Sequence, residues 1–209
     1  MVSVSQIAGQ NTLQRIRQIQ AITIAWMTVE TCVSLSAAWV AHSPALIAFG
    51  GDSAIELLSA AVVLWRFRAR RVGEHAEQKA EERSARIAGC LLFALAAFVA
   101  AASTMSLAGR IEPRPTYWGI AILVTAVIVM PWLTREKRRL SAATGSAALR
   151  ADAAQSGLCA YLSLIALAGL AANVVWHVTW ADPIAALAIT PLILWEGKEA
   201  IRGKPCGCC

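Results

Sequence analysis

The chain has 209 residues, of which 57% are hydrophobic and 15% are charged, and its mean hydropathy is +0.56. Soluble domains carry about 25% charged residues, so this composition excludes an ordinary soluble protein and predicts an integral membrane protein. The net charge is +6, and the basic residues lie between the apolar runs and near the chain ends. Their distribution therefore indicates membrane topology and does not predict a nucleic-acid partner.

Six apolar runs approach the roughly 20 residues that a helix needs to cross a bilayer. They are residues 21–41, 44–65, 87–108, 116–133, 152–176 and 181–197. The expected fold is an all-α membrane protein with six transmembrane helices. Residues 1–20 lack the features of a signal peptide and are expected to form a cytoplasmic segment. Residues 21–201 are expected to form the membrane domain, and residues 202–209 a cytoplasmic Cys-rich tail.

The basic residues predict the orientation of this domain, because Lys and Arg accumulate on the cytoplasmic side of a membrane. Seventeen of them lie in the terminal segments and in the expected inner loops 66–86 and 134–151, the second of which contains Lys137. The other two, Arg110 and Arg114, lie in an expected outer loop. Both termini are therefore expected in the cytoplasm. The lack of sorting signals favours a bacterial plasma membrane.

Acidic residues inside the apolar runs are the first candidates for function. Glu30 lies in the first run, while Asp52 and Glu56 lie four residues apart in the second, which places them on one face of a helix. An Asp at the centre of a membrane helix costs about 2.5–3.5 kcal/mol, so such residues usually mark a functional site. The alternative for Asp52 and Glu56 is a hydrogen-bonded, protonated structural pair. Glu30 is expected to carry protons, or to support a metal site formed by other residues without being a direct ligand.

The fifth run carries a second pair at the same spacing, Gln155 and Cys159, with Asp152 one turn before it. At about 1.5 Å of rise per residue, Cys159 reaches the depth of Asp52. By the same reckoning, Gln155 reaches the depth of both Glu56 and Glu30. If the second and fifth helices are neighbours, carboxylate and thiolate groups meet near mid-membrane, which suits zinc or the softer cadmium.

Each residue of the fifth run also has a structural interpretation. Cys159 could be a small packing residue, and Gln155 could hydrogen-bond between helices or hold a water rather than bind a metal. Asp152 could line an entrance to the site, or lie at the headgroups with Arg150.

The last run and the tail add two expectations. Asp182 precedes Pro183 at the start of the sixth run, where it is expected to N-cap the helix. Cys206, Cys208 and Cys209 end the chain. They can be reduced thiols, a palmitoylation site, or a cytosolic hook that captures a soft metal through thiolates.

Two stretches carry a resemblance to a known family. Residues 43–56, SPALIAFGGDSAIE, and residues 148–159, ALRADAAQSGLC, resemble the second and fifth helices of the membrane domain of the cation diffusion facilitator family. That resemblance covers roughly residues 15–202 and implies a transport site at Asp52, Glu56, Gln155 and Cys159. Glu56 replaces the usual second Asp, Gln155 stands where the family often has His, and Cys159 stands where it has Asp.

The chain resembles a short branch of this family that lacks the cytosolic C-terminal domain. Dimerisation is then expected through membrane helices, for example through the alanine-rich surface of residues 94–102. Such surfaces favour close helix packing.

The resemblance implies proton-coupled export of a divalent cation, zinc or a similar ion such as cadmium, iron or cobalt, and no cofactor beyond the transported metal. Carboxylates crowded in a low-dielectric medium resist ionising together, so an arriving cation can displace the protons that they hold. The rival function is a small proton-coupled exporter of organic cations that uses Glu30 and Asp52 as exchangeable counter-ions. An enzyme is not expected, because the sequence contains no His-Glu-x-x-His run and no nucleophile–base pair.

Overall fold

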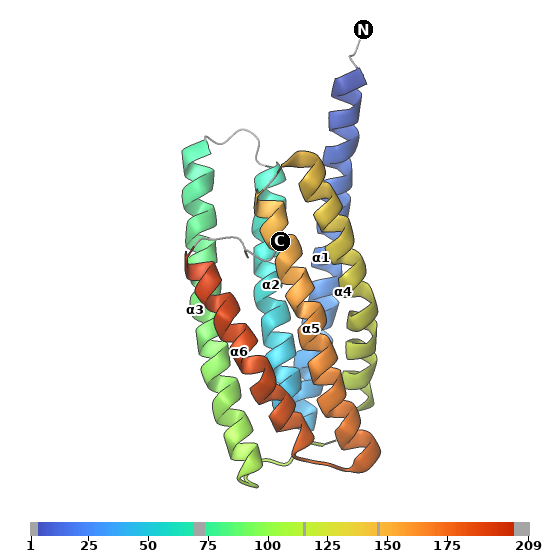
Figure 1. Ribbon diagram of the computed structural model, residues 1–209, viewed down its shortest axis with the longest axis vertical. Coiled ribbons are helices and arrows are strands. Elements are labelled where there is room, and N and C mark those ends of the chain that lie inside the picture. Colours follow the sequence, from blue (N-terminus) through green and yellow to red (C-terminus); the bar gives the residue numbers. More distant parts are fainter. Residues whose placement is uncertain (1–3, 69–73, 115, 146, 203–209) are drawn as a thin grey trace.

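The computed structural model describes the backbone of residues 4–68, 74–114, 116–145 and 147–202. Side chains are described for residues 12–58, 60–61, 86–87, 89–114, 116–145, 149–150 and 152–202. Six helices follow one another along the chain (Figure 1). They are α1 (Val4–Ala41), α2 (Pro44–Arg68), α3 (Glu74–Leu107), α4 (Tyr117–Thr144), α5 (Ala147–Trp176) and α6 (Ala181–Arg202).

The helices form one bundle in which α2 is central. Helix α2 contacts α1, α3, α5 and α6, while α4 packs between α1 and α5, and α3 packs along α6. In Figure 1 the start of α1 lies at the upper end of the bundle, and α6 rises from the lower end and stops about half-way up beside α3. The expectation that the second and fifth helices are neighbours is confirmed. Their contact allows polar residues of the two helices to meet inside the bundle.

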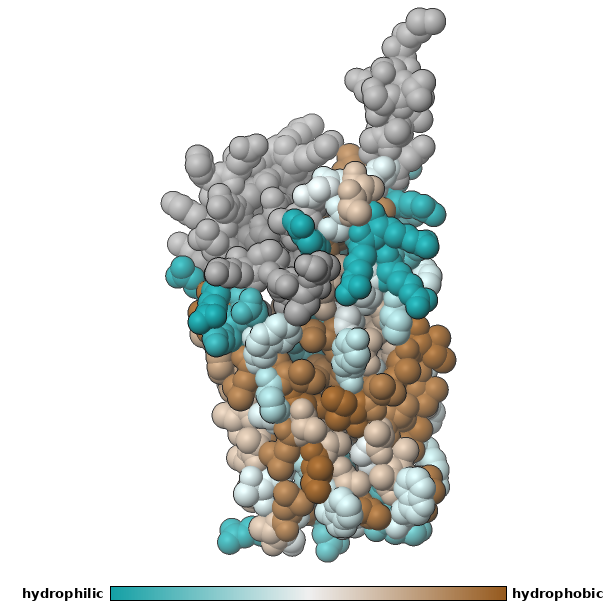
Figure 2. All heavy atoms as spheres, viewed as in Figure 1, coloured by the Kyte–Doolittle hydropathy of each residue, from teal (hydrophilic) through white to brown (hydrophobic). Residues whose placement is uncertain are grey.

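Within the described part of the chain, four helical segments are each long and apolar enough to cross a membrane. They are Thr12–Ala41, Gly89–Leu107, Tyr117–Thr144 and Asp152–Trp176. Large apolar side chains remain exposed on the outside of the bundle, and Figure 2 shows them below a more hydrophilic upper region. An exposed apolar surface with a polar interior is expected of a protein dissolved in lipid. The prediction of an all-α membrane protein is confirmed.

All six helices extend beyond the apolar runs that predicted them, and α1, α3 and α4 extend furthest. Helix α1 begins at Val4, and α3 begins at Glu74, inside the expected inner loop. Helix α4 continues to Thr144 and ends where Gly145 adopts a left-handed conformation with φ of 64° and donates its N–H to the carbonyl of Ser141. The expectation of a loop over residues 134–144 was therefore wrong. Hydropathy marks only the part of a helix that lies in lipid, whereas the cap marks its end.

Close approach of the helices depends on glycine at two crossings. A Cβ on Gly50 of α2 would lie 2.5 Å from Ser34 Oγ and 2.9 Å from a methyl of Leu35 on α1. A Cβ on Gly89 of α3 would lie 2.8 Å from the backbone carbonyl oxygen of Gly197 on α6. These contacts leave no room for a side chain. Such small residues let membrane helices approach closely where no hydrophobic force drives their association.

Asp182 joins the start of α6 to the start of α2. The sequence predicted that Asp182 would N-cap α6, but this helix begins at Ala181 and Asp182 lies inside its first turn. Its carboxylate instead accepts hydrogen bonds from Ser43 Oγ at 2.5 Å and from the backbone N–H of Ala45 at 3.2 Å. Asp182 therefore satisfies free backbone and side-chain donors at the N-terminus of α2.

Candidate functional site

The interior of the bundle contains far more buried acids than buried bases. Six acidic side chains are buried among the described residues. One is Asp182, which lies beside the start of α2; the other five lie on four helices: Glu30 of α1, Asp52 and Glu56 of α2, Asp152 of α5 and Glu196 of α6. Of the lysine and arginine side chains that the structure describes, only Lys137 of α4 is buried. This excess of negative or protonatable groups distinguishes the interior from an ordinary apolar core.

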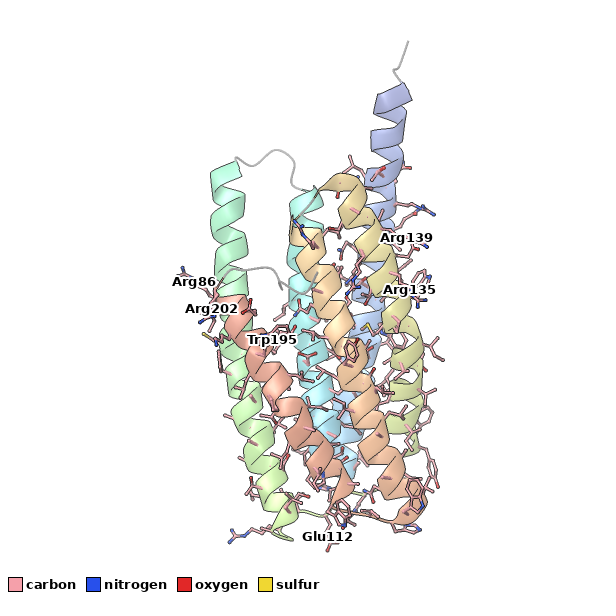
Figure 3. The ribbon with its side chains drawn as sticks, in the orientation of Figure 1. Arg86, Glu112, Arg135, Arg139, Trp195 and Arg202 are labelled. Carbon is pink, nitrogen blue, oxygen red and sulfur yellow. The ribbon has the colours of Figure 1, made fainter. Side chains whose placement is uncertain are left out.

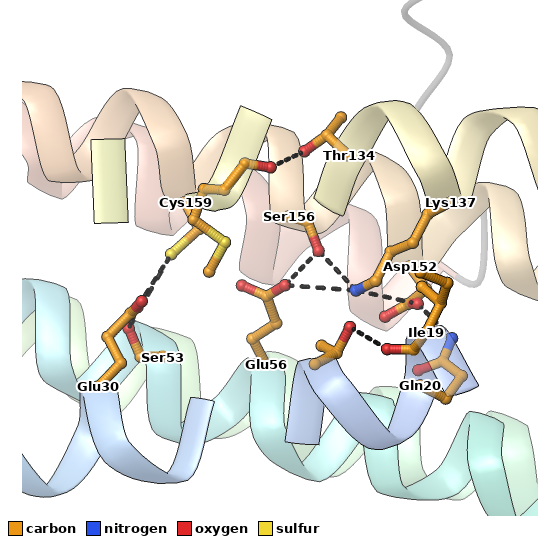
Figure 4. A network of polar contacts seen from close by, with 12 residues as sticks. Ile19, Gln20, Glu30, Ser53, Glu56, Thr134, Lys137, Asp152, Ser156 and Cys159 are labelled. Atoms are coloured by element: carbon orange, nitrogen blue, oxygen red, sulfur yellow. Dashed lines mark hydrogen bonds and ion pairs between the residues drawn. The ribbon is translucent and has the colours of Figure 1, made fainter. Parts of the chain in front are cut away.

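Glu30 and Cys159 meet in the first of three clusters. Ser53 Oγ donates a hydrogen bond to Glu30 Oε1 at 2.6 Å, and Cys159 Sγ donates to the same oxygen at 3.6 Å (Figure 4). Ser53 Oγ also lies 3.9 Å from Cys159 Sγ. Glu30 was expected at the depth of Glu56 and Gln155, and its carboxyl oxygen hydrogen-bonds to Ser53 of α2 and Cys159 of α5.

A second cluster is centred on Ser156 of α5. Its Oγ donates to Glu56 Oε1 at 2.5 Å and accepts a hydrogen bond from Lys137 Nζ at 2.7 Å. Lys137 Nζ lies 3.1 Å from Asp152 Oδ2 and 3.9 Å from Glu56 Oε1. Gln20 of α1 donates to Asp152 Oδ2 at 2.7 Å. Figure 4 shows this chain of contacts running from α2 through α5 and α4 to α1.

The third cluster joins Asp52 to α6. The side chains of Asp52 and Glu196 are hydrogen-bonded to each other, and Gln155 hydrogen-bonds to Glu196. An ionised carboxylate only accepts hydrogen bonds, so two carboxyl groups can be bonded to each other only when one of them carries a proton. The pair is therefore one place where the interior can hold a proton.

The four ligands expected from the sequence are all inside the bundle, but they belong to three different clusters. Asp52 and Gln155 meet through Glu196, and Glu56 contacts Ser156. Cys159 contacts Glu30 and also lies close enough to Glu56 for a side-chain hydrogen bond, so the first two clusters adjoin. Among the described side chains, no three or more His, Cys, Asp and Glu residues are close enough together to hold a metal ion. The side chains lie in one polar interior, where each hydrogen-bonds to other protein groups.

Four of the buried acids keep one carboxyl oxygen without a hydrogen-bond partner in the protein. These atoms are Glu30 Oε2, Asp52 Oδ1, Glu56 Oε2 and Asp152 Oδ1. A buried acceptor without a partner is costly unless a proton, a water or a cation satisfies it. The interior therefore has free oxygen lone pairs of the kind that a hard or borderline cation requires.

Asp152 is buried and pairs with Lys137 and Gln20, whereas Arg150 is exposed. A shared headgroup position of these two residues stays an alternative from the sequence. An entrance role for Asp152 remains a prediction. Cys206, Cys208 and Cys209, expected to capture metal, lie outside the described residues.

Comparison with known proteins decides the family. A family model described as the cation efflux transmembrane domain matches residues 21–202, which is most of the chain. The chain belongs to the cation efflux family. It is an integral, multi-pass membrane protein and a transporter of metal cations. No curated protein in the comparison matches it.

Two functional candidates of this cation efflux protein were missed at the sequence level. Glu196 lies inside the sixth apolar run, so the rule that selected Asp52 and Glu56 also applies to it. Lys137 was counted as a loop charge. Its position three residues after the buried Thr134 and three before the buried Leu140 matches the buried face of a helix, and this spacing was the available signal.

Proposed function

We propose that this cation efflux protein exports a divalent metal cation, zinc or a similar ion such as cadmium, iron or cobalt, from the cytosol in exchange for protons. The observation that carries the proposal is the set of five buried acids, of which only Asp152 and Glu56 lie near the buried Lys137. A cation of charge +2 offsets two of these carboxylates, which neither apolar packing nor Lys137 alone can do. The free carboxyl oxygens supply lone pairs for it.

The metal site that we propose is formed by Asp52, Glu56, Gln155 and Cys159, with Glu196 beside Asp52. Support comes from the contact between α2 and α5 and from the burial of Asp52, Glu56 and Cys159. Asp52 and Glu56 are also both within electrostatic range of Cys159. The side chains exchange their present hydrogen bonds for the metal by rotation about their side-chain bonds. Mixed oxygen and sulfur ligation suits zinc and admits cadmium.

Proton coupling follows from competition for the same atoms. Metal ligands must be deprotonated, so binding of a cation at Asp52 releases a proton that the pair of Asp52 and Glu196 holds. The return of a proton then favours release of the metal on the other side. The rival substrate, an organic cation, needs the acids but gives no role to the Cys159 thiol.

The assembly that we propose is a homodimer in a bacterial plasma membrane, with both termini in the cytoplasm. Part of the alanine-rich surface of α3 supports it, because Ala94, Ala97 and Ala101 are exposed. Ala96, in contrast, is 1% exposed and packs inside the bundle. The dimer contact would therefore use the outward side of α3.

Transport into proteoliposomes tests the proposed function. We expect the unaltered protein to take up zinc into the liposomes when a proton gradient drives protons in the opposite direction. Asp52→Ala should reduce uptake to the level of empty liposomes. The exposed Glu112 (Figure 3) provides the matched control, since Glu112→Gln removes an acid without touching the interior. Movement of lipophilic cations but of no metal by the unaltered protein would establish the rival function.

A further inference from the structure

Lys137 is a base buried among acids, and nothing in the proposed transport cycle uses it. It extends from α4 into the contact between α2 and α5, and its side chain has no exposed surface. The neighbouring basic residues Arg135 and Arg139 point outward from the same helix (Figure 3). The environment of Lys137 is therefore specific to its position on the inner face of α4.

Two acids share the ammonium group of Lys137 unequally. Asp152 Oδ2 lies 3.1 Å from Nζ, a direct ion pair, whereas Glu56 Oε1 lies 3.9 Å away. The Ser156 hydroxyl bridges the longer gap by accepting from Lys137 and donating to Glu56. A small movement of a flexible lysine would exchange Asp152 for Glu56 as its closer partner.

Asp152 is itself held in place. Gln20 of α1 donates to the same carboxylate oxygen that pairs with Lys137, so α1, α4 and α5 converge on one atom. This fixed acid attracts the ammonium away from Glu56, while Glu56 keeps its second oxygen free. The charge nearest to the proposed metal ligand is therefore positioned by a residue outside the ligand set.

We propose that Lys137 is a tethered competitor of the transported cation, and that Asp152 is the positioning residue that holds it off Glu56. The inference rests on the proposed metal site. With the Asp152 side chain in place, the ammonium stays on the α5 side and Glu56 is available to the metal. Without that carboxylate, the ammonium pairs with Glu56 and repels an arriving cation, because like charges at this separation interact strongly in a low dielectric.

Equilibrium binding of zinc to the purified protein in detergent tests the inference, with thermal unfolding as a check on folding. Asp152→Asn keeps the size of the side chain and removes its charge. We expect it to weaken zinc binding by about 10–100-fold, the usual effect of altering a residue that supports a metal ligand. The double variant Lys137→Met with Asp152→Asn should regain the affinity of the unaltered protein or exceed it. Arg135→Met, which removes an exposed charge from α4, should leave affinity unchanged.

The double variant separates competition from a structural role. If Asp152 and Lys137 only stabilise the bundle, removing both leaves the affinity as low as removing one, and the inference is overturned. Unchanged affinity in Asp152→Asn also overturns it. Absence of zinc binding by the unaltered protein contradicts the proposed function itself, so the two failures are distinguishable. The decisive comparison needs no measurement on Lys137→Met alone, the variant most prone to misfold.

Discussion

The thiol of Cys159 on α5 lies 3.6 Å from Oε1 of Glu30 on α1. This contact joins Glu30, expected from the sequence to carry protons or to support the site, to one of the expected metal ligands. It also gives the thiol a carboxylate neighbour, and carboxylate and thiolate together favour borderline and soft divalent cations.

Replacing the thiol should change which metal is preferred. In Cys159→Ser, a hydroxyl takes the place of sulfur, so we expect cadmium transport to fall about tenfold relative to manganese or cobalt, because hard oxygen ligands favour hard cations. Competitive uptake of paired metals into proteoliposomes measures this ratio. Cys90→Ser is the control, since Cys90 is exposed on α3. An unchanged ratio would mean that Cys159 does not bind the transported ion.

Glu196 offers a test of the contact between α2 and α6. Its side chain is 7% exposed and hydrogen-bonds to Asp52 and Gln155. Glu196→Gln retains the size of the side chain, but it removes one of the two carboxyl groups that can hold a proton between them. We expect zinc affinity to fall by about 10–100-fold, as for other residues that support metal ligands.

Two readouts accompany this variant. Fewer protons should be released for each zinc bound, which a weakly buffered solution with a pH indicator can record. Glu199→Gln, three residues along the same helix and partly exposed, should leave both quantities unchanged. Equal effects of the two substitutions would assign the loss to α6 as a whole rather than to the pair with Asp52.

The crossing of α3 and α6 should be sensitive to a single methyl group. In Gly89→Ala, the new Cβ would lie 2.8 Å from the carbonyl oxygen of Gly197, a backbone atom that cannot move without its helix. We expect a loss of about 1–3 kcal/mol in the free energy of unfolding, as for other overpacked interiors. Because Glu196 adjoins this crossing, zinc affinity should fall as well.

Gly157→Ala is the matched control on α5. The nearest atom to its added Cβ is a methyl of Thr134 at 3.5 Å, an ordinary contact. Alanine is the better helix former by about 0.5–1 kcal/mol, so this variant should be as stable as the unaltered protein or slightly more stable. Thermal unfolding in detergent compares the two. Equal stability of both alanine variants would show that the crossing tolerates a side chain.

Hydropathy alone predicted the number of helices and the membrane fold, because the cost of burying polar groups in lipid selects long apolar runs. It misplaced the ends of α1, α3 and α4, which continue beyond the apolar runs. Lys137 was assigned to a loop for this reason. A helical reading of residues 130–141 would have placed it on the buried face.

The spacing of Asp52 and Glu56, and of Gln155 and Cys159, was sufficient to select residues that lie inside the bundle. It could not determine their partners. Glu30, Glu196 and Lys137 come from α1, α6 and α4, far from the two motifs in sequence. Glu30 hydrogen-bonds to Cys159, Glu196 hydrogen-bonds to Asp52 and Gln155, and Lys137 lies 3.9 Å from Glu56.

The amino-acid sequence by itself determined that this chain crosses a membrane as helices, and that its acids and thiol repeat at one turn of a helix. Both are local properties, set by the transfer energy of each side chain and by the helical period. Only the tertiary structure decided which of these groups contact one another and which contact a serine or a lysine. Such pairings depend on how the helices cross and rotate about their axes, and small residues such as Gly50 and Gly89 set those crossings through contacts between distant parts of the chain.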